Sequence, residues 1–180
     1  MAIATIKNID RLTQKLNNIS NMELDKAMSQ ALTLVHGQAK SRAPVGTSGG
    51  AGLRGSIKME RIRGKNELKG RVYTNLEYAS YVEFGTGIKG NGTYPYDIKG
   101  LNLVYRDSVW FIPASEIDEK VAKRYHFKKL HFKDGDYYIC YGQPAQPYMY
   151  PALKDNEKTI KALFKNGVKT KLEESCKGGR

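Results

Sequence analysis

Cysteine and histidine are scarce in this sequence. Its 180 residues include two cysteines, Cys140 and Cys176, and three histidines. A disulfide framework needs more cysteines, so we expect two reduced thiols. His126 and His131 are five residues apart, which puts them on different faces of a strand or helix. Zinc ligands come in close pairs, so we expect no metal site and no cofactor.

Long apolar runs are also absent. No segment approaches the roughly 20 apolar residues that cross a membrane, so we expect no membrane contact. The first residues, Met1–Lys7, lack the charged head and apolar stretch of a secretory signal, and we expect the chain to begin in the cytoplasm. The composition, 40% apolar and 27% charged, is typical of a soluble globular domain.

The net charge of +12 is unevenly distributed. Residues 53–71 carry seven basic and two acidic groups, and residues 150–180 carry eight and four, whereas residues 72–149 carry nine of each. Such a bias is compatible with a polyanion such as DNA nearby. A plain solvated surface on a basic protein is the more common explanation.

Helical periodicity is clear near the N-terminus. Ser20 and Glu23 have the spacing of a capping box, and an apolar stripe follows, formed by Leu24, Met28, Ala31, Val35 and Ala39. Pro44 ends this helix. A shorter stripe predicts an earlier short helix, or an extension, within residues 1–20 that breaks near Asn18; it is formed by Ile9, Leu12, Leu16 and Ile19.

Short strands and turns fill the middle of the chain. We predict strands over 53–62 and 67–74, then a helical turn over 78–84 that Gly85 stops. Two further pairs of strands are predicted at 101–105 with 109–112, and at 127–133 with 137–141. Asp134-Gly135 is a strong hairpin signal for the second pair.

A long helix closes the sequence, with Pro151 in its first turn. Its predicted buried face consists of Leu153, Ile160, Leu163, Phe164 and Val168. The whole chain, 1–180, is therefore predicted to be one α+β domain: N-terminal helices, an antiparallel sheet with inserted hairpins, and a long C-terminal helix. We expect the glycine-rich loops 43–52 and 85–100 to be flexible, and 170–180 to be a disordered tail.

Two short motifs imitate enzyme signatures. Gly46–Gly50 matches a nucleophile elbow, but that elbow needs a strand before it and a helix after it. Gly85–Gly90 matches a dinucleotide fingerprint, but the sequence after it reads as more loop and no βαβ unit surrounds it. Glu83 could be a general base, yet no partner for it lies nearby in sequence, and a salt bridge is the simpler explanation. We therefore predict no catalytic residues and no small-molecule substrate.

Tyrosine is abundant, with twelve residues, and it suits contact surfaces because it joins apolar area to a polar tip. Plain packing is the alternative. Our candidate interface residues are Tyr78, Tyr81, Glu83, Phe84, Gln146, Tyr148 and Tyr150.

Three ordered stretches carry a family resemblance. They are Ala43-Pro44-Val45-Gly46-Thr47 with Leu53-Arg54-Gly55-Ser56-Ile57, then Tyr78–Thr86 (YASYVEFGT), then Gly142–Leu153 (GQPAQPYMYPAL). Together they resemble the neck-protein family of tailed bacteriophages, the head–tail joining or tail-completion proteins, over roughly residues 39–153. The chain departs from the compact pattern in the extra residues 48–52 and in the long stretch 88–141.

The resemblance implies a non-enzymatic ring of identical copies at the head–tail junction, with genomic DNA passing through its lumen. Its implied partners are portal-side adaptor and tail proteins, and its place is the virion after a stage in the host cytoplasm. A tail terminator of the same region and a free basic nucleic-acid-binding protein are the alternatives. For the DNA-facing surface we predict one lysine stripe, Lys154, Lys158, Lys161 and Lys165, or else Arg61, Arg63, Lys69 and Arg71.

Overall fold

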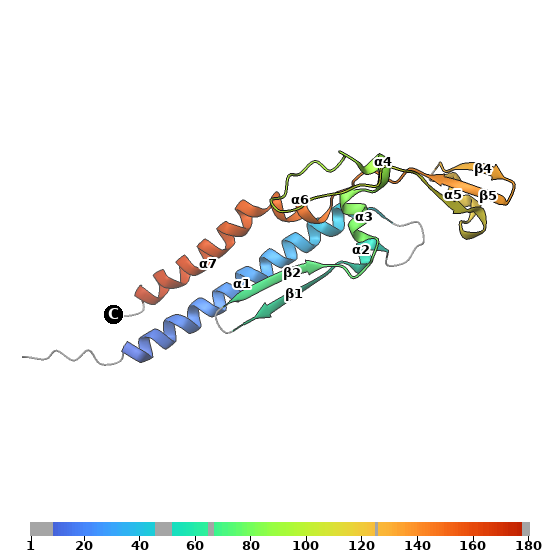
Figure 1. Cartoon of the computed structure of the whole chain (residues 1–180). Helices are drawn as coiled ribbons and strands as arrows, with labels where there is room; N and C mark the ends of the chain where they lie inside the picture. The colour runs from blue at the N-terminus through green and yellow to red at the C-terminus, as the bar shows by residue number, and fades with distance from the viewer. Residues whose placement is uncertain (1–8, 46–51, 65–66, 125, 178–180) are drawn as a thin grey trace, which may run out of the picture. The chain divides into compact units, whose positions relative to one another are not determined.

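In the computed structural model, the described residues are 9–45, 52–64, 67–124 and 126–177 (Figure 1). They fall into two compact units. The first contains residues 1–75 and 149–180, and the second contains residues 76–148, inserted into the first. Helices and antiparallel strands confirm the predicted α+β class. The division into compact units does not test the single domain predicted over 1–180, which stays a prediction.

The first unit is built on one long helix, α1 (Ile9–Arg42). The predicted break near Asn18 is wrong: the helix runs through it, because an asparagine inside a helix costs only about 0.7 kcal/mol relative to alanine. The end before Pro44 is confirmed. Within the predicted stripe, Ala31, Val35 and Ala39 are buried.

A β-hairpin lies along α1 (Figure 1). Strands β1 (Lys58–Arg63) and β2 (Leu68–Tyr73) are antiparallel, with Arg61 opposite Gly70. A β-carbon on Gly70 would stand 2.5 Å from Met28 Sδ and 2.9 Å from Leu32 Cδ2, so the absent side chain lets β2 approach α1. The first residues of the predicted strand 53–62 instead form a helical turn, α2 (Leu53–Ser56), which buries Leu53.

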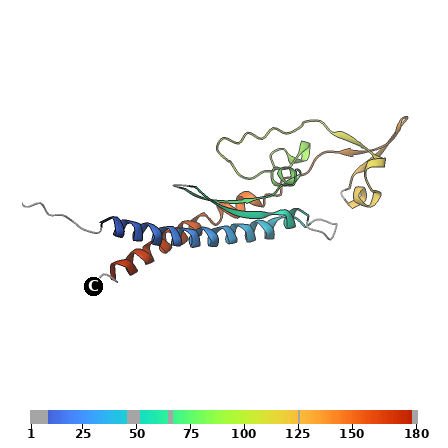
Figure 2. The same ribbon diagram turned by 90° about the horizontal axis from the view of Figure 1, so that it is seen from below.

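Two helices close the first unit, α6 (Met149–Lys154) and α7 (Glu157–Lys177), and α7 packs along α1 (Figures 1 and 2). The turn between them takes Leu153 out of the predicted buried face; its exposure is 54%. The other four members of that face are half-buried. Residues 170–177 are helical where the sequence predicts a disordered tail.

The second unit begins with two short helices, α3 (Ala79–Phe84) and α4 (Gly87–Gly90). A sheet of order β3-β5-β4 follows, built from β3 (Trp110–Pro113), β4 (Lys128–Phe132) and β5 (Gly135–Cys140). The 3-10 turn η1 (Ala114–Glu116) and helix α5 (Glu119–Arg124) lie between β3 and β4 in the chain. The predicted helical turn at 78–84 and the hairpin around Asp134-Gly135 are both confirmed.

The predicted strand 101–105 is wrong. Its residues form no ladder, and β3 pairs with β5 instead. The segment is held by a side chain: the Tyr105 hydroxyl donates a hydrogen bond of 2.9 Å to the Phe84 carbonyl. A local apolar alternation predicts extended backbone but cannot supply a partner strand.

Candidate assembly surfaces

The first family-like stretch closes the end of α1. The Arg54 guanidinium donates hydrogen bonds to the Ala43 carbonyl, at 2.8 and 3.2 Å, and to the Ser41 carbonyl at 3.3 Å. A cation here satisfies carbonyls that a helix C-terminus leaves without partners and complements the helix dipole. Leu53 and Ile57 on either side are buried. The stretch is therefore a structural clamp, and its residues 46 and 47 lie outside the described part.

The second and third stretches are joined to each other inside the second unit. The Gln146 amide donates to the Val82 carbonyl at 2.8 Å, and Thr86 and Gln143 form an antiparallel bridge. The Gln143 side chain adds a bond of 3.0 Å to the Tyr81 carbonyl. Residues about sixty positions apart in sequence thus fix each other's backbone.

Glycine makes this crossing possible. Gly142 has φ +87°, and a β-carbon on it would stand 1.9 Å from the Thr86 carbonyl oxygen. Gly85 and Gly87 also have positive φ and press against backbone of residues 141–145. The glycines of the apparent dinucleotide fingerprint therefore allow two segments of the same chain to approach each other closely. The helical turn α4 lies within this stretch, and residues 91–98 after it form turns and irregular backbone, as the sequence predicts.

Glu83 and Tyr148 form the buried centre of this crossing. Their exposures are 5% and 2%. Glu83 Oε2 accepts a hydrogen bond of 2.8 Å from the Tyr148 amide. Burial, with the nearby Glu83 charge, raises the pKa of the Tyr148 phenol to about 12, so this side chain stays neutral at physiological pH. These two candidate interface residues are therefore buried, and they stabilise the crossing beneath the surface.

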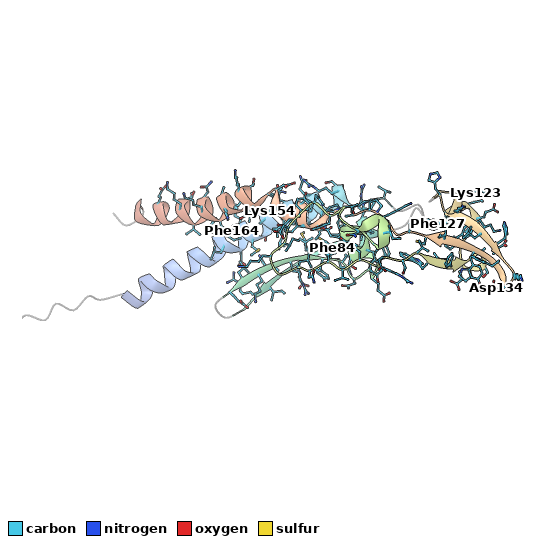
Figure 3. All side chains as sticks on the ribbon, turned by 45° about the horizontal axis from the view of Figure 1, so that its top comes forward. Phe84, Lys123, Phe127, Asp134, Lys154 and Phe164 are labelled. Atoms are coloured by element: carbon cyan, nitrogen blue, oxygen red, sulfur yellow. The ribbon has the colours of Figure 1, made fainter. Side chains whose placement is uncertain are left out.

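Other members of the predicted interface are accessible. Tyr78 and Tyr81 are 45% and 58% exposed and lie one helical turn apart at α3, so they share a face. Gln146 is exposed, and Tyr150 is half-buried. Phe84 is half-buried against Tyr94, with the ring centroids 5.1 Å apart; Figure 3 labels it.

The alternative basic set is paired with acidic neighbours. Arg61 and Arg63 both pair with Asp25 of α1, and the hydrogen bond from Arg63 lowers the pKa of that carboxyl. Lys69 pairs with Glu67, and Arg71 with Glu60. These four cations share three carboxylates, so neighbouring acidic groups balance most of their charge.

The lysine stripe spans the turn between α6 and α7, where Figure 3 labels Lys154. Lys154 and Lys161 both bind Glu157, whose pKa they lower, Lys161 first. Lys158 and Lys165 are exposed, and the described residues include no ion pair for either. Lys158, Lys161 and Lys165 share one face of α7, because their spacings are three and four.

The described residues contain no group of three or more histidine, cysteine, aspartate or glutamate side chains that could bind a metal. None of the helices in that described part is long and apolar enough to span a membrane. Cys140 is a buried free thiol, and the elbow-like residues 46–50 lie in a segment that the structure leaves undescribed.

Sequence reasoning missed Arg54 and Gly142 as organising residues. Both stand in the family-like stretches, so their position there was a usable signal. What the sequence could not show was the partner of each residue, which lies on another segment of the chain.

The family comparison covers the first two of these stretches and less than half of the chain. Residues 4–85 match the HK97-gp10-like family model, described as "Bacteriophage HK97-gp10, putative tail-component". This match confirms the resemblance to tailed-phage neck and tail proteins. The matched segment contains α1, the β-hairpin and α3, so it ends at the first glycine of the crossing. No curated protein and no solved structure matches the chain.

Proposed function

We propose that this chain is a non-enzymatic structural protein of a tailed-phage virion, forming a ring that joins head and tail. The match of residues 4–85 to a phage tail-component family carries the proposal. The three ordered stretches support it, since each one closes a helix end or a chain crossing and none assembles catalytic groups. Portal-side and tail proteins are its proposed neighbours, and exposed Tyr78 and Tyr81 are proposed contact residues.

Labelling of virions tests the proposed place. An antibody against this chain should mark the neck region of purified particles in electron micrographs, one focus for each particle. A focus at the upper end of free tails that have not met a head would instead indicate the tail terminator. Absence of the chain from particles and tails would remove the proposal.

A nucleic-acid-binding protein acting alone is less well supported. Of the eight candidate DNA-facing residues, Arg61, Arg63, Lys69 and Arg71 are held in ion pairs, as are Lys154 and Lys161. A free binder needs several unpaired cations on one surface to reach useful affinity. A ring needs fewer unpaired cations on each copy, because every copy places its own cations around the same duplex.

Within this proposal, Lys158 and Lys165 face the DNA. The double variant Lys158→Glu/Lys165→Glu should fold and join particles, yet lower the infectious titre at least about tenfold through lost DNA retention or ejection, since it turns attraction for phosphate into repulsion. Encapsidated DNA and plaque titre are the measurements.

The matched control is Lys99→Glu/Lys120→Glu, which makes the same change of charge at two exposed lysines of the second unit. It should leave the titre near that of the parent. Equal titres for the two double variants would show that the stripe is ordinary surface.

A further inference from the structure

Two asparagines in this chain are followed by glycine, in Asn91-Gly92 and Asn166-Gly167. Asparagine is a chemically labile residue, and a following glycine makes it more so, because no side chain shields the glycine main-chain nitrogen. That nitrogen can attack the side-chain carbonyl carbon of the asparagine. Both asparagines are exposed, whereas their backbones differ. The fold therefore decides which of the two reacts.

Asn91 and Gly92 are the central residues of a β-turn that follows α4 (Figure 1). Asn91 has φ −59° and ψ 126°, Gly92 has φ +70°, and the Thr93 amide donates to the Gly90 carbonyl at 3.1 Å. These values define a type II turn, which one backbone hydrogen bond closes. A β-carbon on Gly92 would meet nothing within 4 Å, so the peptide group between Asn91 and Gly92 has room to rotate.

Ring closure needs a rotation that this turn permits. The attack brings the Asn91 β-carbon and the Gly92 nitrogen into line about the Cα–C bond, and ψ 126° holds them roughly 110° apart. The peptide plane can swing between its two ends when ψ of Asn91 and φ of Gly92 change together. Glycine tolerates both signs of φ, so the swing is open to it. The reaction therefore requires only the movement of one exposed turn.

Asn166 lies in the middle of α7 (Glu157–Lys177) and is protected by that helix. In a regular helix the Gly167 amide donates to the carbonyl four residues earlier, and hydrogen bonds on either side fix ψ of Asn166. A rotation at Asn166 must open part of the helix, which happens only in rare local unfolding. In the folded chain, we expect the reaction at Asn91 to be at least about tenfold faster than at Asn166.

We propose that Asn91 is a site of spontaneous deamidation in the folded protein, wherever the chain is assembled. The Gly92 nitrogen bonds to Asn91 Cγ, the bond from Cγ to the amide nitrogen breaks, and ammonia leaves with the proton of the Gly92 N–H. The five-membered succinimide that remains takes up one water molecule. Opening at one carbonyl gives aspartate. Opening at the other gives isoaspartate, in which the main chain passes through the side-chain carboxyl carbon.

Isoaspartate at this position disturbs the chain crossing. The Thr93 hydroxyl donates to the Gly90 carbonyl at 2.6 Å and accepts from the Ala145 amide at 2.8 Å, so it ties the turn to the third family-like stretch. Isoaspartate adds one atom to the main chain between Gly90 and Gly92, inside the segment that this hydroxyl closes. Aspartate adds the same negative charge and leaves the main chain unchanged. The two products therefore separate a change of charge from a change of backbone.

Peptide mass spectrometry measures the reaction at each site. The purified full chain, held for weeks in mildly alkaline buffer, should show the mass of an amide converted to a carboxyl group at Asn91 and much less of it at Asn166. In concentrated urea the two sites should react at similar rates, because the fold alone distinguishes them. Equal or reversed rates in the folded chain, or an Asn91 that reacts only in urea, would overturn the proposal.

Urea unfolding of the separated products tests the effect on the crossing. Trp110 fluorescence should show a lower unfolding midpoint for chains with isoaspartate at position 91 than for the parent. Freshly prepared Asn91→Asp carries the charge on an unaltered main chain and should unfold like the parent. Asn91→Ser lacks the reacting amide and should keep its midpoint through the same incubation. Equal midpoints for the parent and the isoaspartate chain, or an equal loss in aged Asn91→Ser, would refute the effect assigned to isoaspartate.

Discussion

Replacing Gly142 with alanine is expected to unfold the second unit. The residue has φ +87°, and the new β-carbon would stand 1.9 Å from the Thr86 carbonyl oxygen, which is backbone and cannot swing away. The Thr86–Gln143 bridge must then open, and with it the crossing of residues 81–86 with 141–148. We expect a loss of at least about 4 kcal/mol in the free energy of unfolding.

The control for this variant separates backbone strain at a positive φ from collision of the new β-carbon with neighbouring backbone. Gly100 has φ +84°, nearly the same backbone, but nothing lies within 4 Å of its added β-carbon. Gly100→Ala should therefore cost only about 1–2 kcal/mol. Trp110, the only tryptophan, lies against Gly87 in the same crossing, so its fluorescence during urea unfolding reports both variants. Similar losses for the two would show that the close approach is unimportant.

Removal of the Glu83 side chain is the second large effect that we expect. Glu83→Ala leaves the buried amide of Tyr148 without its carboxylate acceptor and opens a cavity beside the Tyr148 ring. An unpartnered buried donor and the cavity together should lower the unfolding free energy by about 2–4 kcal/mol.

The matched variant is Glu83→Gln, whose amide oxygen can still accept from the Tyr148 N–H in nearly the same volume. It should cost about 1 kcal/mol or less. In urea unfolding, the free energy of unfolding should be lowest for Glu83→Ala, higher for Glu83→Gln and highest for the parent. This order checks that Glu83 positions Tyr148 through its hydrogen bond. If both variants were equally destabilised, the lost negative charge rather than the hydrogen bond would be the cause, and the positioning role would be refuted.

Periodic patterns predicted local structure well in this chain. The stripe of Ala31, Val35 and Ala39, the helix end before Pro44 and the hairpin at Asp134-Gly135 all rest on nearest-neighbour geometry, which the sequence contains directly. The failures have one cause. Residues 101–105 look like a strand but have no partner, and Leu153 continues a periodicity that a turn interrupts.

The candidate surface residues show the same limit of sequence-based prediction. Tyr78 and Tyr81 are exposed, whereas Tyr148 has the same residue type but lies in the core. Residue type alone could not separate them, because burial depends on a crossing of segments about sixty residues apart. For the same reason, neither the ion pairs of Arg61 and Arg63 with Asp25 nor those of Lys154 and Lys161 with Glu157 could be read from charge counts.

The insertion of residues 76–148 fixes the order in which the parts of the first unit are synthesised. As the chain leaves the ribosome, α1 and the β-hairpin emerge first, but their partners α6 and α7 are made only after the second unit. The part of α1 that α6 and α7 cover therefore stays exposed to water until they are made. The inserted unit can already fold, because its three-stranded sheet and its chain crossing both lie within residues 76–148. Nascent chains stopped between 148 and 157 should then be the species most dependent on chaperones.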